Sequence, residues 1–339
     1  MSRLQKYIIH HLSILFLSIF LPLFAIASVI FLIKLATYTA VIHLTIWEMT
    51  KLYLFVLPEV LFYTLPVTFF IAATLTLFRL STDNEIVVLF SLGIRPSFII
   101  KTLFKPALLL SLLLSFDFFI LFPHATVLSS NFVSYKKSEA KFNLSASEFG
   151  HRFGDWLLYI GKDNPDGTFG DVFLFNKTQK EEILIEAKKA EVINESGLLR
   201  LKLINGEGYN YSKEKFSQIN FDIMYINDTM TTNLTTYRTP LEYWKSSDRK
   251  ESKTHMFITD TLLSLFPIIS LFLVVSIGIV HVRHQKAKVY LYLFLGILVF
   301  YGTTLGLQKV LVFYTIPTVA ILWFISTYIV YRKTIVARF

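Results

Sequence analysis

The chain has 339 residues, 54% of them hydrophobic and 33 of them Phe, and its mean hydropathy of +0.55 predicts a membrane protein with several spans, because soluble globular chains lie near zero or below. It contains no Cys, which excludes disulfides, thiolate metal sites and Cys nucleophiles. The net charge is +9, but residues 124–255 hold 18 basic and 18 acidic side chains, so the excess of positive charge lies around the apolar stretches. A nucleic-acid-binding protein would concentrate positive charge on its polar domain, so that class of protein is excluded.

The N-terminal segment reads Met-Ser-Arg-Leu-Gln-Lys and then becomes apolar over a long run. A cleaved signal peptide has a short apolar core followed by small residues at its cleavage site, and that pattern does not occur here. We therefore expect the first apolar run to be retained as a membrane span.

Six apolar stretches are long enough to cross a hydrocarbon core ~30 Å thick, which takes about 20 helical residues. They cover residues 12–33, 53–78, 98–122, 256–280, 289–308 and 311–331. Pro58 and Pro66 lie in the second stretch, where proline marks a kink that neighbouring helices tolerate. Glu59 follows Pro58 and has either a packing or hinge role or an interfacial position. The last two stretches are almost contiguous, which predicts a tight antiparallel pair.

Basic residues in the short segments predict the orientation of the spans. Twelve lie on the side of the N-terminus: Arg3, Lys6, Arg79, Arg95, Lys101, Lys105, Arg283, Lys286, Lys288, Arg332, Lys333 and Arg338. Three lie on the opposite side: Lys34, Lys51 and Lys309. Both termini are therefore expected in the cytoplasm, and the insert 124–255 is expected on the outer side, which is the periplasm in a Gram-negative cell.

Eighteen residues, from Arg79 to Pro96, separate the second and third spans. A simple turn would not need this length, so the segment predicts a helix at the membrane face that docks on a soluble partner. In a helix Arg79 and Asp83 lie four residues apart and are close enough to pair. Asp83 and Glu85 are acidic residues on a strongly basic side, which suits a basic groove of a partner, and Gly93 ends the helix. The alternative is a solvated interfacial loop.

The insert 124–255 predicts a β domain. Residues 156–162 and 171–175 have the apolar composition of short strands, and the Asn, Pro, Asp and Gly of 163–167 favour a turn between them. Further alternating segments with turns between them are typical of a sandwich or jelly roll. The alternating apolar face either lines a groove or fills a small core. Residues 130–148 look helical and are expected to extend the third span outward.

No catalytic signature occurs in the sequence. It lacks a phosphate-binding P-loop, a zinc-protease motif and a nucleophile elbow, so we expect neither catalysis nor P-loop binding of ATP, and no cofactor. Asp117 and Asp260 lie near the outer ends of their spans, which favours interfacial positions. His281 and His284, in a basic loop, are expected to add affinity for lipid headgroups, with metal binding as the alternative.

Three lysines ring the outer membrane face, namely Lys34, Lys51 and Lys309. They are candidates for contacting the phosphates of an anionic lipid substrate that enters from the outer leaflet. The alternative is that they are anchors whose ammonium groups reach the interface. Lys34 is the strongest candidate, because it ends the first span beside a polar outer loop.

Gly302 and Gly306 form a GxxxG pattern in the fifth span. Small residues at this spacing let two membrane helices approach closely, so this face is a candidate subunit interface. The pattern also arises by chance.

The order of three spans, a β domain and three spans resembles the LptF/LptG permeases, which export lipopolysaccharide. The resemblance rests on Pro58-Glu59 and Pro66, on Arg79-Leu-Ser-Thr-Asp-Asn-Glu-Ile followed by Gly93, and on the strand segments from Leu158 to Gly206, and it covers nearly the whole chain. It implies an α-helical integral membrane protein with six spans and an inserted periplasmic jelly roll. The implied parts are 1–123, with a coupling helix at about 79–94, the jelly roll 124–255, and 256–339.

The resemblance also implies a mechanism. Two paralogous six-span permeases pair in the bacterial inner membrane, and a dimeric cytoplasmic ABC ATPase binds their coupling helices. Lipopolysaccharide leaves the outer leaflet through the paired spans and passes along the jelly rolls to a periplasmic bridge protein. Here Glu85, with Asp83 and Arg79, would seat in the ATPase groove, and Gly302 and Gly306 would lie at the seam between permeases.

The sequence departs from the family at 282–288, where a Pro-Arg-x-Gly-Arg-like loop keeps its basic character but lacks the Gly. It does not settle which paralogue this chain is, although the LptF type is favoured. The alternatives to a non-catalytic transport subunit are a membrane-anchored periplasmic enzyme or a scaffold that acts through the β domain. A scaffold or enzyme would tolerate changes at Glu85, whereas a transporter would lose ATPase docking.

Overall fold

The structure, a computed structural model, describes residues 3–39, 44–141, 151–153, 156–165, 167–177, 181–195, 198–212, 215–227, 239–246, 250–280 and 288–337. The chain separates into two compact units. The first, which we call the helical unit, comprises Met1–Leu35, Met49–Val127 and Tyr237–Phe339. The second, the sheet unit, comprises Ala36–Glu48 and Leu128–Thr236.

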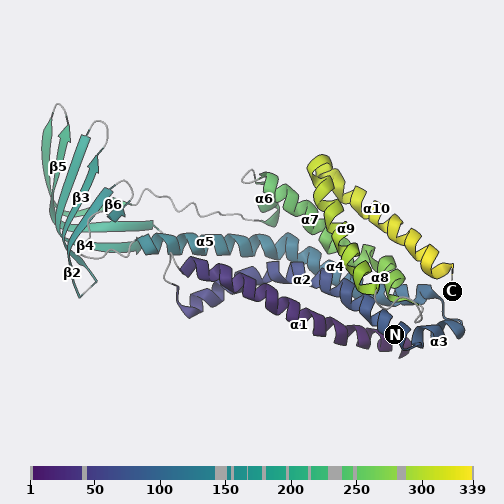
Figure 1. Cartoon of the computed structure of the whole chain (residues 1–339). Coiled ribbons are helices and arrows are strands. Elements are labelled where there is room, and N and C mark those ends of the chain that lie inside the picture. The colour runs from purple at the N-terminus through teal and green to yellow at the C-terminus, as the bar shows by residue number, and fades with distance from the viewer. Residues whose placement is uncertain are drawn as a thin grey trace. The chain divides into compact units, whose positions relative to one another are not determined.

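The helices follow the apolar stretches of the sequence (Figure 1). The N-terminal group is α1 (Arg3–Thr39), α2 (Ile46–Thr82), α3 (Glu85–Ser91), α4 (Pro96–Phe116), the π-helix η1 (Asp117–Leu121) and α5 (Phe122–Lys141). The C-terminal group is α6 (Pro240–Lys245), α7 (Lys250–Ile269), α8 (Leu271–Gly278), α9 (Lys288–Leu311), the 3-10 helix η2 (Val312–Tyr314), α10 (Thr315–Tyr331) and the π-helix η3 (Arg332–Val336). The extension expected for 130–148 is helical through Lys141, and its remainder lies outside the described residues.

Within the described residues, four helical stretches are able to cross a membrane by length and hydropathy, or five if α7 and α8, which are bent by 49°, form one span. The four are Arg3–Thr37, Ile46–Thr82, Pro96–Lys136 and Lys288–Val336. The six spans expected from the sequence are not confirmed by this count. The last stretch turns back at η2, where Val312 has a positive φ of 47°, so α9 and α10 run antiparallel (Figure 1).

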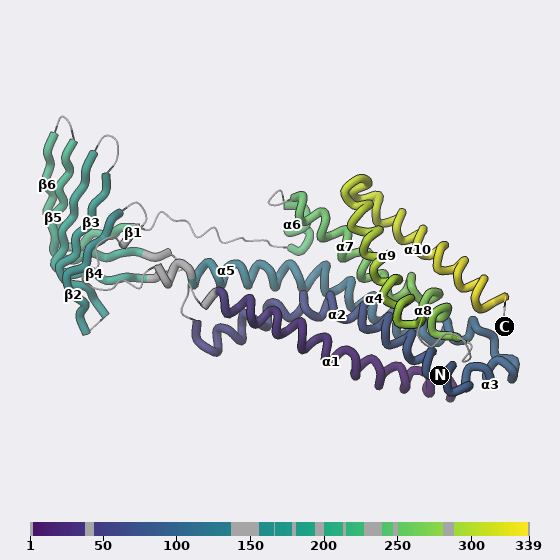
Figure 2. The backbone as a smooth tube through the Cα atoms, in the orientation of Figure 1, coloured from purple at the N-terminus to yellow at the C-terminus, as the bar shows by residue number. Residues whose placement is uncertain are grey.

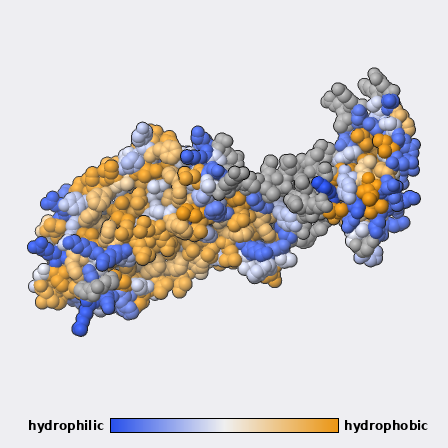
Figure 3. All heavy atoms as spheres, turned by 180° about the vertical axis from the view of Figure 1, so that it is seen from behind, coloured by the Kyte–Doolittle hydropathy of each residue, from blue (hydrophilic) through white to orange (hydrophobic). Residues whose placement is uncertain are grey.

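Aromatic side chains form the centre of the helical unit. Phe266 packs against Phe70 and Phe300, with ring centroids 5.2 and 4.5 Å apart. The Trp323 indole lies beside them and donates to the Ser270 hydroxyl at 2.9 Å, at the break between α7 and α8. Figure 3 shows that apolar side chains also cover most of the visible outer face of this unit. An apolar exterior of this extent is that of a protein surrounded by lipid.

The third long helix contains a π-bulge. α4 continues through η1 into α5, and the wider turn of a π-helix leaves backbone carbonyls without their usual partners. The Trp244 indole donates to the carbonyl of Phe119, within this bulge, at 3.4 Å. Its ring also lies 5.3 Å from that of Phe257. The bulge is therefore held by packing against α6 and α7.

The described strands form one antiparallel sheet in the order β1 to β6, in which each strand pairs with its neighbours in the chain. They are β1 (His151–Phe153), β2 (Trp156–Asp163), β3 (Phe169–Lys177), β4 (Glu181–Glu195), β5 (Leu198–Ser212) and β6 (Phe216–Asn227). A jelly roll pairs strands that are distant in sequence. The described strands form a meander instead, so the expected jelly-roll topology is not confirmed.

A line of interrupted pairing crosses the sheet through Gly161, Asp171, Lys188, Asn205 and Asp222. Two of these residues have left-handed backbone, with φ values of 51° for Asp171 and 53° for Asn205. The strands turn sharply in this region (Figure 2). The bend lets one face of a single sheet enclose a core, which is formed by Leu158, Ile160, Val172, Leu174, Ile185, Ala187, Ala190, Leu201, Leu203 and Ile226.

Candidate functional site

The segment between the second and third spans is a short helix between two turns. α2 runs to Thr82, and Asn84 then adopts a left-handed conformation with φ 61° before α3 begins at Glu85. Gly93, with φ 83°, reverses the chain after α3, and α4 starts at Pro96. The expected single helix over about 79–94 is therefore two helical pieces separated by a tight turn.

The predicted pair of Arg79 and Asp83 is present at the end of α2. Arg79 Nε lies 3.9 Å from Asp83 Oδ2, and the two side chains are 65% and 55% exposed. An exposed pair of this kind contributes at most about 1 kcal/mol to stability. Because both side chains are more than half exposed, both charges are accessible to another molecule.

Glu85 contacts the first helix. The Tyr7 hydroxyl lies 2.9 Å from one carboxylate oxygen of Glu85 and 2.8 Å from the other, and it donates to the carboxylate. Hydrogen bonds to an ionised acceptor are stronger than neutral ones. This contact joins the N-terminal end of α1 to the start of α3. Sequence reasoning missed Tyr7, because nothing in the sequence signals a contact across 78 positions.

α3 has an inner and an outer side. Ile86 is buried in the core of the helical unit, whereas Val88 is 54% exposed and Leu92 is 73% exposed. Glu85 and Val88 lie on one side of α3, and Leu92, which caps the helix and donates its N–H to the Val88 carbonyl at 3.0 Å, continues the i, i+3, i+7 spacing of that side. We call these three residues the docking face. It combines one carboxylate with two exposed apolar side chains.

The base of this segment is fixed to α8. The backbone N–H of Val280, just beyond α8, donates to the Ser81 hydroxyl at 3.2 Å. Gly278 lies against α2 so closely that a Cβ there would be 2.7 Å from Leu77 Cβ and 2.8 Å from the Thr74 carbonyl oxygen. The segment is therefore linked to α1 through Tyr7 and, through the end of α2, to the residue just beyond α8.

Pro58 and Pro66 both lie inside α2, which continues past them as one helix. Pro66 is buried, and the Thr64 hydroxyl donates to the Val60 carbonyl at 2.8 Å in the turn between the two prolines. Glu59 is partly buried in the same region. The structure therefore places all three within the packed part of the helix without showing a hinge movement.

Acidic side chains lie inside the bundle near Glu59. Asp260 is 2% exposed and accepts a hydrogen bond from the Tyr63 hydroxyl at 3.3 Å, and Asp117, in the π-bulge, is 5% exposed. Both carboxyl groups are enclosed by neighbouring helices, while the interfacial depth expected for Asp117 and Asp260 stays a prediction. Sequence reasoning had not singled out Tyr63.

The three predicted lysines lie on three different helices, and all are exposed: Lys34 on α1, Lys51 on α2 and Lys309 on α9. The Lys34 ammonium lies over the Phe31 ring, 5.5 Å from its centroid, and within electrostatic range of Glu59 on α2. The structure therefore brings Lys34 near another predicted residue.

Gly302 and Gly306 lie on an open side of α9. Both are exposed, and a Cβ added at either position would meet no atom within 4 Å. Gly296 on the same helix differs, because its Cβ would lie 3.3 Å from Leu273 and from Phe70. The GxxxG face is therefore not used for packing within the described residues, and it leaves room for another helix.

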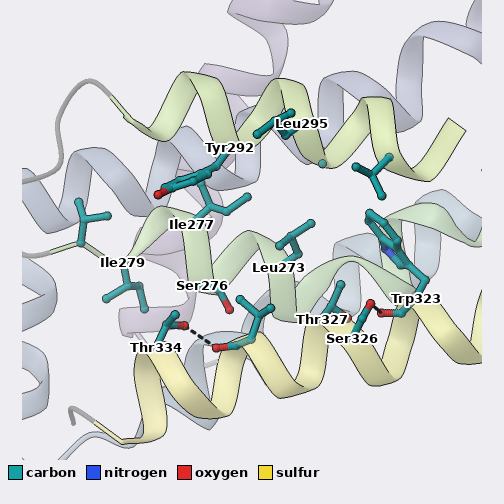
Figure 4. A pocket seen from close by; sticks show the side chains of 14 residues that line it. Leu273, Ser276, Ile277, Ile279, Tyr292, Leu295, Trp323, Ser326, Thr327 and Thr334 are labelled. Carbon is teal, nitrogen blue, oxygen red and sulfur yellow. Dashed lines mark hydrogen bonds between the residues drawn. The ribbon is translucent and has the colours of Figure 1, made fainter. Parts of the chain in front are cut away.

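The described residues contain no group of three or more His, Cys, Asp or Glu side chains that is able to hold a metal ion. His281 and His284 lie outside the described residues. A cavity of about 500 Å³ opens between α8, α9 and α10 (Figure 4). It is separate from the docking face and is lined largely by apolar side chains.

Comparison with known families gives one result that covers almost the entire chain. The family described as "Lipopolysaccharide export system permease LptF/LptG" matches residues 6–330. Among curated proteins, no match was found.

Proposed function

Because this chain belongs to the LptF/LptG family of lipopolysaccharide export permeases, we propose that it is a non-catalytic subunit of an ABC-type transporter whose separate ATPase docks on α3. The observation that carries the proposal is the docking face. Glu85, Val88 and Leu92 present a carboxylate beside exposed apolar groups, as a helix that inserts into a partner's groove does. This chain would bind no cofactor, and the ATPase would bind the ATP.

We further propose six membrane spans, formed by α1, α2, α4–α5, α7–α8, α9 and α10. The stretch Lys288–Val336 has 49 residues, so as one straight helix it would be about 74 Å long, more than twice the hydrocarbon core. The turn at η2 supports two spans. The excess of basic residues at the N-terminal side supports cytoplasmic termini and a periplasmic sheet unit.

α1 is proposed to carry the movement from the ATPase to the lipid. It has few buried residues, notably Ile8, Leu12 and Leu35. Its polar contacts with neighbouring helices include Tyr7 to Glu85 and, farther along, Ser28 to Tyr53 at 2.8 Å. A helix with few buried side chains is able to shift when α3 moves.

The substrate side would lie at the other end of α1. Lys34 on this helix, with Lys51 and Lys309, is proposed to contact the phosphates of lipopolysaccharide that enters from the outer leaflet. Their exposure supports this role and equally suits interfacial anchors. Lys34 has the additional support of the acidic Glu59 nearby, which would orient its side chain.

Two further surfaces suit the proposed partners. The open face at Gly302 and Gly306 would receive the paralogous permease. β6 is an edge among the described strands, and Ile219 and Ile223 on it are 60% and 52% exposed. An exposed edge of this kind is able to pair with a strand of a periplasmic bridge protein and so pass lipid from sheet to sheet.

Reconstituted transport tests this function. Proteoliposomes that contain this chain, its paralogue and the ATPase should release lipopolysaccharide to an added bridge protein when ATP is supplied. The Glu85→Ala variant should assemble its spans normally but lose most ATP-dependent release. Full release with Glu85→Ala would show that α3 does not couple ATP to transport. It would favour the scaffold or enzyme alternatives.

A further inference from the structure

The cavity between α8, α9 and α10 is not explained by the export proposal. It has a volume of about 500 Å³, within the range of ordinary ligand sites, and lies wholly within the helical unit. Leu273, Leu295 and Val299 form much of its wall. Trp323 lies at the end opposite Ile279 and Thr334 (Figure 4). An apolar cavity that opens to the surface of a membrane protein is accessible to lipid chains.

The polar atoms of the wall do not require a polar ligand. The hydroxyls of Ser276, Ser326 and Thr334 each donate to a carbonyl of their own helix, at 2.7, 2.9 and 2.8 Å. The Thr327 hydroxyl donates to the Phe324 carbonyl at 3.0 Å. Because these groups are satisfied by backbone, the cavity presents mainly carbon atoms to an occupant.

The length of the cavity matches one leaflet of a bilayer. Trp323 on α10 and Thr334 in η3, which follows it directly, line the cavity eleven residues apart. At 1.5 Å per residue they are about 16 Å apart along the axis, roughly half of a ~30 Å hydrocarbon core. In the orientation proposed above, this half is the cytoplasmic one.

Three basic residues adjoin the cytoplasmic end of the cavity in the sequence without lining it. Arg332 and Lys333 directly precede Thr334, and Lys288 begins the helix that carries Tyr292; all three charged side chains are exposed. In Figure 4 the Tyr292 hydroxyl points toward this end. Basic pockets between membrane helices on the cytoplasmic side recognise anionic lipid headgroups.

We propose that this cavity binds an acyl chain of an anionic phospholipid from the cytoplasmic leaflet, with its phosphate held near Arg332, Lys333 and Tyr292. The proposal rests on the orientation in the proposed function but concerns a different lipid from the exported one. The bound phospholipid would fill the space between α8 and the α9–α10 pair. It would thereby support the end of α8 that is bonded to Ser81, beside α3.

Trp323 provides a direct probe, since it lines the cavity. The full chain with Trp47, Trp156 and Trp244 replaced by Phe has this indole alone. It is placed in nanodiscs of phosphatidylcholine with a small fraction of either acyl-brominated phosphatidylglycerol or acyl-brominated phosphatidylcholine, and bromine quenching is measured. We expect the anionic lipid to quench at a lower mole fraction than the zwitterionic one.

Two variants test the two halves of the site. Val299→Phe fills the cavity and should abolish the quenching, whereas Leu298→Phe, at the neighbouring exposed position outside the cavity, should not. Arg332→Gln with Lys333→Gln should reduce the preference for the anionic lipid by about fivefold for each charge removed. Lys105→Gln, at another exposed basic position, is the control.

The proposal would be overturned if both lipids quenched Trp323 equally and Val299→Phe left this quenching unchanged, because bulk lipid alone would then explain the quenching. If neither lipid quenched Trp323, or if the added second permease protected Trp323 from quenching, protein would cover the cavity. Either result would also overturn the proposal. Fluorescence does not depend on export, so this result and the transport experiment fail or succeed separately.

Discussion

The Tyr7 hydroxyl bridges to the carboxylate of Glu85, with distances of 2.9 and 2.8 Å to its two oxygens, and so links α1 to α3. In the proposed transporter the same carboxylate faces the ATPase. Both the docking of the ATPase and the movement of α1 would therefore depend on the Glu85 side chain. Removing the Tyr7 hydroxyl should disturb only the movement of α1.

Tyr7→Phe removes this hydrogen bond but keeps the aromatic ring. The ATPase should still bind, whereas ATP-dependent lipopolysaccharide release should fall about fivefold, since a partly exposed bond to a charged group contributes roughly 1 kcal/mol. Binding is measured by co-purification and release in proteoliposomes. Tyr290→Phe, at an exposed position on α9, is the matched control. Equal release by both variants would show that Tyr7 does not transmit the movement.

Leu92→Asp should weaken ATPase binding without destabilising the permease. Leu92 is 73% exposed, and substitutions at such positions change stability by about 0.5 kcal/mol or less. A carboxylate in place of this side chain would lose an apolar contact and put a charge where the docking face is apolar. Ser97→Asp, exposed at the start of α4, is the control. If Leu92→Asp and Ser97→Asp bound the ATPase equally well, the interface would lie elsewhere.

The glycines of α9 should differ in what they support. A Cβ at Gly302 would meet no atom within 4 Å, so with Gly302→Leu the free permease should keep its thermal stability while its assembly with the second permease fails. Gly296→Leu should instead destabilise the chain itself by about 1–3 kcal/mol, because Leu273 and Phe70 already lie 3.3 Å from the added Cβ. Thermal unfolding and native gels distinguish the two. Normal heterodimer formation by Gly302→Leu would exclude this face as the seam.

The bend in the sheet depends on close packing at Gly206. A Cβ there would lie 2.2 Å from the Glu186 carbonyl oxygen and 2.5 Å from the Phe221 ring, so Gly206→Ala should destabilise the sheet unit by at least about 1–3 kcal/mol. Gly208→Ala, whose nearest contact would be 3.9 Å away, should be tolerated. Protease resistance of strands β4–β6 measures the difference. Equal resistance of the two variants would mean that the bend does not need the glycine.

Reversing the charge of Lys34 should weaken lipid contact while leaving the complex intact. Lys34→Asp would place a carboxylate near Glu59 and repel phosphate, so photo-crosslinking of lipopolysaccharide to α1 should fall severalfold. Lys34→Arg keeps the charge and should crosslink normally. Unchanged crosslinking in Lys34→Asp would assign this lysine to anchoring at the interface.

Apolar runs and charge predict much of this fold, because a ~30 Å apolar layer imposes a length that is visible in one sequence. The helix over the second apolar stretch, the exposed pair of Arg79 and Asp83, and the reversal at Gly93 follow from such local signals. The left-handed Asn84 also had a local signal, since Asn tolerates that conformation, yet it was missed.

Contacts between distant segments had no such signal. Tyr7 meets Glu85, and Tyr63 meets Asp260, only because separate helices pack side by side. Burial of Asp117 likewise depends on the π-bulge and on the helices around it. In the sheet, alternation predicted the strands but not their order, because the same pattern fits a meander and a jelly roll.

The central claim is that this chain is a permease subunit driven through the docking face. The most direct measurement is co-purification from native membranes, with mass spectrometry of everything bound, for the unaltered chain and for Glu85→Lys. We predict that the unaltered chain recovers an ABC ATPase, a second six-span permease and lipopolysaccharide, and that Glu85→Lys loses the ATPase but keeps the second permease. Recovery of the chain alone after mild crosslinking, or equal recovery of the ATPase by Glu85→Lys, would contradict the account.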